Sequence, residues 1–221
     1  MRAALATLML LLAGCGPTTP MSDETSRPPL PDYPASGAAS RVYNVDPSSS
    51  LLLVKTGRSG RASRFGHDHA IASETLAGVI EIHEEPDRSR ADLAFAVREL
   101  IVDKPAYRER LALATQPSES DIAGTYTNML KVLGPEEHAW VTLAVRPAEP
   151  GIFAVSATVR GTTAEFLVPV SLTEQDDRLS VSAELVVSHS DFALQPFSAL
   201  GGLLGVADEL AVTIELVAIR R

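Results

Sequence analysis

The segment IFAVSATVRGTTAEFLVPVSL, residues 152–172, decides the fold class because it contains two runs in which every second residue is apolar. The alternating positions are Phe153, Val155, Ala157 and Val159 in the first run, and Phe166, Val168, Val170 and Leu172 in the second. Successive side chains of a β-strand point to opposite faces, so a period of two places these residues on one face. The segment therefore predicts two strands, each with one buried face.

Similar strand signals recur along most of the chain from residue 41 onward. Six further segments are SLLLVKT (50–56), GVIEIHEE (78–85), ADLAFAVREL (91–100), AWVTLAVRP (139–147), RLSVSAELVVS (178–188) and ELAVTIELVAI (209–219). Short turn signals such as Gln175-Asp176-Asp177 separate neighbouring runs. Together these segments predict about eight strands.

One insertion, between residues 104 and 134, has a helical period instead. A stripe at a spacing of about 3.6 residues is formed by Ile122, Tyr126, Met129, Leu130 and Leu133. Ser118 with Asp121 three residues later resembles a helix-capping arrangement, and Gly134-Pro135 ends the helix. A shorter helix is predicted over residues 105–114.

The predicted fold class is mainly β, a single antiparallel barrel or sandwich of about eight strands with a helical insertion. An eight-stranded barrel is just wide enough to fill itself with side chains or to hold one small ligand. Its inward-type residues are mostly Ala, Val and Leu, and aromatic residues make up only 5% of the chain. This composition favours a cavity, with a packed core as the alternative.

The N-terminal sequence MRAALATLMLLLAGC (1–15) has the pattern of a secretion signal that is too short to span a bilayer. Leu12-Ala13-Gly14-Cys15 resembles a bacterial lipobox, in which the cysteine is lipidated; the alternative is an ordinary signal peptide with a stray cysteine. We predict a signal peptide over 1–14, a disordered Pro/Ser/Thr-rich tether over 15–40 and a barrel domain over 41–221. The protein would then be extracytoplasmic and anchored through Cys15. The residue after the cysteine is Gly16 and not Asp, which resembles the pattern of lipoproteins sorted to the outer membrane. In a Gram-negative organism we would therefore expect the protein at the outer membrane, facing the periplasm.

Charge and motifs exclude several classes of function. A net charge of −9 argues against nucleic-acid binding. The sequence contains no Gly-x-Ser-x-Gly, no His-Glu-x-x-His and no glycine-rich phosphate loop. The segment Ser188-His189-Ser190-Asp191 has the residue types of a serine triad, but neighbours on a strand point to opposite faces. We predict that the protein is not an enzyme.

Two histidines flank an aspartate in SRFGHDHAIA, residues 63–72. If this segment enters a strand, His67 and His69 share one face, a spacing that can ligate zinc or copper. Further ligands would have to come from Asp68, Glu81, His83, His138 or His189. The alternatives are polar groups at a barrel mouth that bind a lipid head group, or histidines that bond only to backbone carbonyls.

Three segments resemble the YceI-like family: VYNVDPSSSLLLVKT (42–56), SATVRGTTAEFLVPVSL (156–172) and SHSDFALQPFSALGGLLGVADELAVTIELVA (188–218). The matching positions are Tyr43 and Asp46, Gly161 and Thr162, Ser190 and Phe192, and Val206 and Asp208. The resemblance implies an extracytoplasmic lipocalin-like barrel that binds polyisoprenoid lipids, including isoprenoid quinones, in an elongated apolar tunnel. The sequence departs from the family pattern at residues 107–142 and at Gly66-His67-Asp68-His69, where many members have Gly-x-Phe.

With this resemblance, we expect an amphiphilic isoprenoid-like lipid as ligand and no cofactor other than that lipid or a metal ion. The predicted lining residues lie on the apolar faces of their strands: Phe95, Val97, Leu143, Val145, Phe153, Val155, Phe166, Val168, Leu185 and Ile214. The apolar loop 192–205 would form a lid or a membrane-touching rim, or pack over the barrel. The alternative functions are a metal-binding lipoprotein using His67 and His69, and a non-catalytic interaction protein with a filled core.

Overall fold

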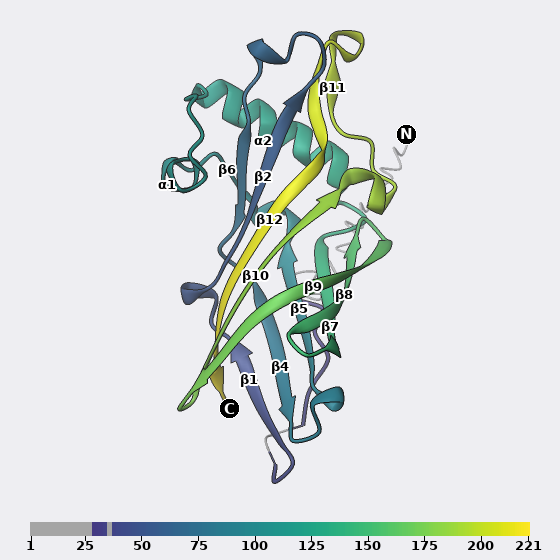
Figure 1. Cartoon of the computed structure of the whole chain (residues 1–221). Helices are drawn as coiled ribbons and strands as arrows, with labels where there is room; N and C mark the ends of the chain where they lie inside the picture. Colours follow the sequence, from purple (N-terminus) through teal and green to yellow (C-terminus); the bar gives the residue numbers. More distant parts are fainter. Residues whose placement is uncertain (1–27, 35–36) are drawn as a thin grey trace, which may run out of the picture.

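Eight antiparallel strands form a closed ring in the computed structural model, which describes residues 28–34 and 37–221. In ring order they are β1 (Ser40–Val45), β4 (Ala77–His83), β5 (Arg90–Ala96), β7 (Trp140–Glu149), β8 (Ile152–Val159), β9 (Thr162–Gln175), β10 (Arg178–Ser188) and β12 (Leu204–Arg220). Pairing of β1 with β12 closes the ring. The predicted class, a mainly β antiparallel barrel with a helical insertion, is confirmed (Figure 1).

A second group of strands, here called the wing, extends the sheet beside the upper half of β12 as drawn in Figure 1. The wing consists of β2 (Leu51–Ser59), β3 (His69–Ser73) and β6 (Ile101–Val102). A short strand, β11 (Ser198–Ala199), pairs with the start of β12. The eight strands predicted from sequence are all strands, but β2 lies in the wing and the unpredicted β1 takes its place in the ring.

The long strand β12 changes partner partway along its length, and this change separates ring from wing. Its C-terminal part pairs with β1, and residues 205–215 pair with β2. A 3-10 turn at Pro47–Ser49 joins β1 to β2, with the Asp46 carboxylate accepting from the Ser48 N–H at 3.1 Å. The Ser50 hydroxyl then accepts from the backbone N–H of Val217 at 3.1 Å, so a side chain occupies the ladder where the partner changes.

Two α-helices lie beside the wing, α1 (Pro105–Arg110) and α2 (Glu119–Leu133). The capping box of α2 is formed as predicted by Ser118 and Asp121, and Gly134 ends the helix with a φ of 59°. The predicted apolar stripe packs inward through Met129, Leu130 and Leu133. The shorter helix ends before residue 114, because Ala112 adopts a φ of 52° and the chain turns back to bond with the helix.

The lower end of the ring is a packed core. Tyr43, Leu179 and Ala218 are each 0% exposed there. The Tyr43 hydroxyl donates to Glu174, which also accepts two hydrogen bonds from Arg41, at 2.8 and 2.9 Å. These contacts plug the end of the barrel that carries the chain's C-terminus (Figure 1).

Part of the predicted tether packs on the outside of the barrel. Tyr33 is 3% exposed and lies against Val42 and Val79, and its hydroxyl donates to the Asp92 carboxylate. The guanidinium of Arg90 stacks 4.2 Å from the centre of the Tyr33 ring. Residues 28–34 are therefore attached to the domain, whereas the predicted signal peptide, Cys15 and the start of the tether lie outside the described residues.

Candidate ligand-binding cavity

An apolar cavity of about 470 Å³ occupies the barrel between the packed lower end and helix α2. Its wall is built from the inward faces of the strands, because residues at every second position of β2, β5, β7, β10 and β12 point into it. Nine of the ten predicted lining residues line the cavity: Phe95, Leu143, Val145, Phe153, Val155, Phe166, Val168, Leu185 and Ile214. The alternation of the sequence therefore identified the inner face correctly.

The prediction for Val97 is wrong. Strand β5 ends at Ala96, and Val97 opens a 3-10 turn, Val97–Glu99, so the alternation stops one residue too early. Its backbone N–H donates to the carbonyl of Ala139 at 2.9 Å, and its side chain is 2% exposed within the core. Val97 thus packs in the core and does not line the cavity.

Several lining residues were missed by the sequence prediction. Helix α2 contributes Met129, Val132 and Leu133, and the wing contributes Leu52 and Val54. The helical stripe was visible in the sequence, but nothing in its spacing indicated that it would close a barrel. The alternation of Leu52 and Val54 was hidden because the neighbouring Leu51 and Leu53 are also apolar.

The lower polar part of the wall is internally paired. Glu81 accepts from Nε of Arg90 at 2.8 Å, and the Ser89 hydroxyl accepts from the His83 N–H at 2.9 Å. Burial raises the pKa of Glu81, but the hydrogen bonds from Arg90 and Ser40 and the positive charge of Arg90 together outweigh this effect and lower the pKa overall. These groups therefore satisfy one another beside the apolar wall.

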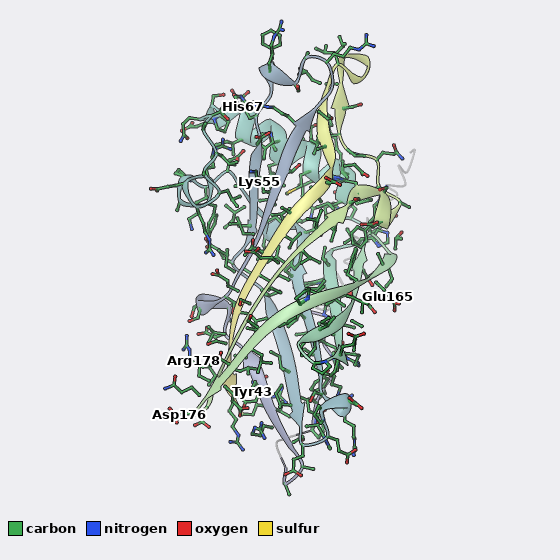
Figure 2. The ribbon with its side chains drawn as sticks, viewed as in Figure 1. Tyr43, Lys55, His67, Glu165, Asp176 and Arg178 are labelled. Atoms are coloured by element: carbon green, nitrogen blue, oxygen red, sulfur yellow. The ribbon has the colours of Figure 1, made fainter. Side chains whose placement is uncertain are left out.

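The upper polar part of the wall brings together Thr56, His67 and His69. Thr56 and His69 are directly paired across β2 and β3, and the ring centres of His67 and His69 are 6.4 Å apart. His67 precedes β3 instead of lying in a strand, yet both histidines face the cavity as predicted for a polar mouth. Figure 2 shows His67 near α2, at the opposite end of the barrel from Tyr43.

The Asp103 carboxylate, which forms a buried ion pair with Arg108, fixes the orientation of His69. Its Nδ1 lies 2.6 Å from Oδ2 of Asp103, whose Oδ1 accepts from the Ala70 N–H at 3.0 Å and from Arg108. Burial raises the pKa of Asp103, but the hydrogen bonds from His69, Ala70 and Arg108 together hold it below its ordinary value. Asp103 is therefore a carboxylate, and no sequence signal linked it to a histidine 34 residues away.

The structure does not assemble the predicted further metal ligands around His67 and His69. His138 contacts Gly161, His189 bonds to the Asp208 carbonyl at 2.9 Å, and Asp68 accepts from the Arg58 N–H at 3.1 Å. Glu81 belongs to the lower polar part of the wall, and Nδ1 of His83 accepts from the Glu85 N–H at 3.0 Å. Within residues 28–34 and 37–221, no group of three or more His, Cys, Asp or Glu is arranged to hold a metal ion.

The loop 192–205 divides its apolar residues between the cavity and the surface. Phe192 is 6% exposed and packs on Phe166, with ring centres 6.1 Å apart, and Phe197 lines the cavity. Leu200 and Leu203 instead face solvent, with exposed fractions of 69% and 47%. The loop therefore covers the cavity with one part and presents an apolar tip with another.

Among the described residues, no helix has both the length and the apolar character needed to cross a membrane. The fold and the cavity together define a lipocalin-like barrel with an apolar site whose wall is polar at its two ends.

Comparison with solved structures identifies barrels of the same kind. A polyisoprenoid-binding domain from Saccharophagus degradans matches with a TM-score of 0.55 at 14% identity, over 81% of this chain and 98% of that chain. BcnA from Burkholderia cenocepacia matches with a TM-score of 0.51, also at 14% identity, over 78% of this chain and 98% of that chain. No family model and no curated protein matches the sequence. At this identity the likeness concerns the fold alone: the chain shares the barrel fold of these two proteins, which is the fold that the sequence resemblance implied.

Proposed function

We propose that this protein binds an amphiphilic isoprenoid-like lipid, such as a polyprenoid or an isoprenoid quinone, with the tail inside the barrel. The observation that carries the proposal is the cavity of about 470 Å³, whose wall is apolar except at its two ends. Ligand cavities of roughly 300–1,000 Å³ with few polar groups are typical of small-molecule sites. The fold shared with a polyisoprenoid-binding domain supports the same choice of ligand.

Burial of the tail supplies the affinity. Each Å² of apolar surface removed from water contributes about 25 cal/mol, so a tail that buries several hundred Å² gains on the order of 10 kcal/mol. Ordering the tail and losing its translational freedom offset part of this gain. Binding therefore depends on free space in the barrel more than on any single contact.

Native mass spectrometry of the full chain, purified from its membrane without chelator, tests the proposal. A stoichiometric adduct that organic extraction identifies as an isoprenoid lipid supports it. A mass gain equal to one metal ion would favour the metal-binding alternative at His67 and His69, and a bare polypeptide would favour a filled core.

Two neighbouring positions on β10 provide a matched pair of variants. Ala183 lines the cavity and Ser182 is exposed on the outer face of the same strand. Ala183→Trp should abolish the lipid adduct by filling the cavity, while Ser182→Trp should retain it. Equal adducts in both variants would contradict a ligand inside the barrel.

We further propose that the protein is an extracytoplasmic lipoprotein held in the membrane through Cys15, at the outer membrane and facing the periplasm in a Gram-negative cell. The support is the Leu12-Ala13-Gly14-Cys15 sequence after an apolar stretch. Metabolic labelling with palmitate should mark the wild-type protein and leave Cys15→Ala unlabelled. Labelling of the variant would refute the anchor without bearing on the cavity.

A further inference from the structure

Two buried polar atoms at the upper end of the cavity have no hydrogen-bond partner within the described part of the chain. They are Oγ1 of Thr56 and Nδ1 of His67, and both residues line the cavity. Thr56 is 3% exposed, so its hydroxyl cannot turn to bulk water. A buried polar group without a partner costs free energy, and such a group facing a cavity indicates where a ligand's polar atom would lie.

His69 adds an acceptor beside these two atoms. An ionised carboxylate only accepts hydrogen bonds, so the proton shared between His69 and Asp103 belongs to Nδ1 of the imidazole. In a neutral imidazole the other nitrogen, Nε2, then carries a lone pair. Nε2 makes no hydrogen bond to any residue that the structure describes, and the ring lines the cavity. Asp103 and Arg108 thus fix both the orientation of the ring and the nitrogen that can accept.

The charges around this end are already paired. Arg108 neutralises Asp103, and Nε of Arg58, the cation that lines this part of the described wall, lies 3.7 Å from Asp68. Asp121 lies close enough to influence both His67 and His69 electrostatically. A phosphate head group would bring negative charge into an apolar cavity whose described wall offers no unpaired cation at this end. The free-energy cost of removing the phosphate from water would therefore be high.

We propose that the upper end of the cavity is a head-group site for a neutral lipid bearing a hydroxyl group, held by Thr56, His67 and His69. The ligand hydroxyl donates to Nε2 of His69, and its oxygen accepts from the hydroxyl of Thr56, its neighbour across β2 and β3. Nδ1 of His67 offers the ligand hydroxyl a further hydrogen bond. The shared chemistry is an uncharged hydroxyl, which an isoprenoid alcohol and a prenylated hydroquinone both provide. This inference rests on the proposed lipid-binding function and deepens it.

The test is an equilibrium binding titration of the full chain with four geranylgeranyl compounds that share one tail. The alcohol and the hydroquinone donate a hydrogen bond, the methyl ether does not, and the phosphate is charged. We expect at least one hydroxyl compound to bind about tenfold more tightly than the ether and the phosphate, since one hydrogen bond in a dry site has roughly that effect. The stronger of the two hydroxyl compounds identifies the source of the hydroxyl.

Thr56→Val is the decisive variant. It removes the hydroxyl that donates to the ligand oxygen, so it should lower affinity for the hydroxyl compound about tenfold and make the ligand-free protein no less stable. Thr158→Val is the matched control, because the Thr158 hydroxyl bonds to Thr163 at 2.8 Å and does not line the cavity. His69→Phe removes the acceptor for the ligand O–H, which the ether lacks, so it should abolish the preference for the hydroxyl compound over the ether. Its stability is measured separately because Asp103 loses a partner.

The outcomes separate this site from the proposed function. Equal binding of all four compounds, tighter binding of the phosphate or the ether, an unchanged affinity for the hydroxyl compound in Thr56→Val, or an unchanged preference in His69→Phe would overturn the head-group site and leave lipid binding intact. Failure of all four compounds to bind would overturn both.

Discussion

Replacing Arg108 by methionine tests whether the buried ion pair behind the upper end of the cavity holds this part of the fold together. The side chains of Arg108 and Asp103 are 1% and 0% exposed, and the guanidinium donates to the carboxylate. The guanidinium also donates to the carbonyl of Asp68, 2.9 Å from Nη1, and to that of Thr115, 3.2 Å from Nε. Methionine keeps much of the apolar stem and supplies none of these hydrogen bonds.

We expect the free energy of unfolding to fall by about 3–4 kcal/mol. Removing one partner of a buried ion pair costs roughly 3–5 kcal/mol, because the other charge stays buried without compensation. Asp103 keeps its hydrogen bonds from His69, at 2.6 Å, and from the Ala70 N–H, at 3.0 Å, which places the loss toward the lower end of that range. Since domains have total stabilities of about 5–15 kcal/mol, the variant should still fold.

Urea unfolding measures this loss, followed by the fluorescence of Trp140, the single tryptophan of the chain. Arg110→Met is the control, because Arg110 lies in the same helix but pairs with Glu215 at the surface, with side chains 41% and 48% exposed. An exposed pair of this kind contributes about 0–1 kcal/mol. If Arg108→Met costs no more than Arg110→Met, the buried pair does not stabilise the fold and the reasoning fails.

Three further predictions concern stability. A Cβ at Gly78 would collide with the Leu93 side chain and lie 2.9 Å from Cγ2 of Val45, so Gly78→Ala should lower the free energy of unfolding by about 1–3 kcal/mol, measured by thermal unfolding. Gly124 in α2 has open space around it, so Gly124→Ala should instead raise the stability by about 0.4–1 kcal/mol. If Gly124→Ala were the more destabilising of the two, the packing argument would be contradicted. The pKa of Asp103 is lowered on folding, so the stability that this residue contributes is present above its unfolded pKa of about 4 and is lost as pH falls through the lowered value. Asp103→Asn should therefore flatten this part of the curve of unfolding free energy against pH. An unchanged curve would show that the protonation of Asp103 is not coupled to folding. Tyr33→Phe removes the hydrogen bond to Asp92 and should cost about 0.5–1.5 kcal/mol in urea unfolding, whereas no change would mean that residues 28–34 add nothing to stability.

Strands with one dry face could be predicted from sequence, and strands buried on both faces could not. In β1, Val42 and Tyr43 are neighbours and both are buried, because Tyr33 covers the outer face over Val42. In β3, Ala70 and Ala72 are buried against the side that carries α1, and Ile71 lines the cavity. Burial on both faces erases the period of two, so neither strand left a pattern in the sequence.

The candidate site was predictable where it depends on alternation and unpredictable where it depends on contacts between distant residues. His67 and His69 stood out because two histidines two residues apart are rare in this chain, which has five in all. The roles of Asp103 and Arg108 come from the turn after β6, which returns the carboxylate to the Ala70 N–H and the His69 ring. Thr56 had no sequence signal at all, since a threonine at the end of an apolar strand is ordinary.

The shortness of β6 limits the strand edge that the described sheet leaves open. A strand with unpaired backbone N–H and C=O groups is a template for edge-to-edge aggregation, and a closed ring has no such strand. In the described sheet, β6 stands at the end of the strand order and is an edge strand. It has only two residues, and it contacts α2. Where β6 stops, Asp103 continues the pairing with Ala70 through its own N–H, at 2.7 Å, and through its carboxylate. The residue that orients the cavity histidine thus also pairs with β3 beyond the end of β6, which leaves less of that edge unpaired.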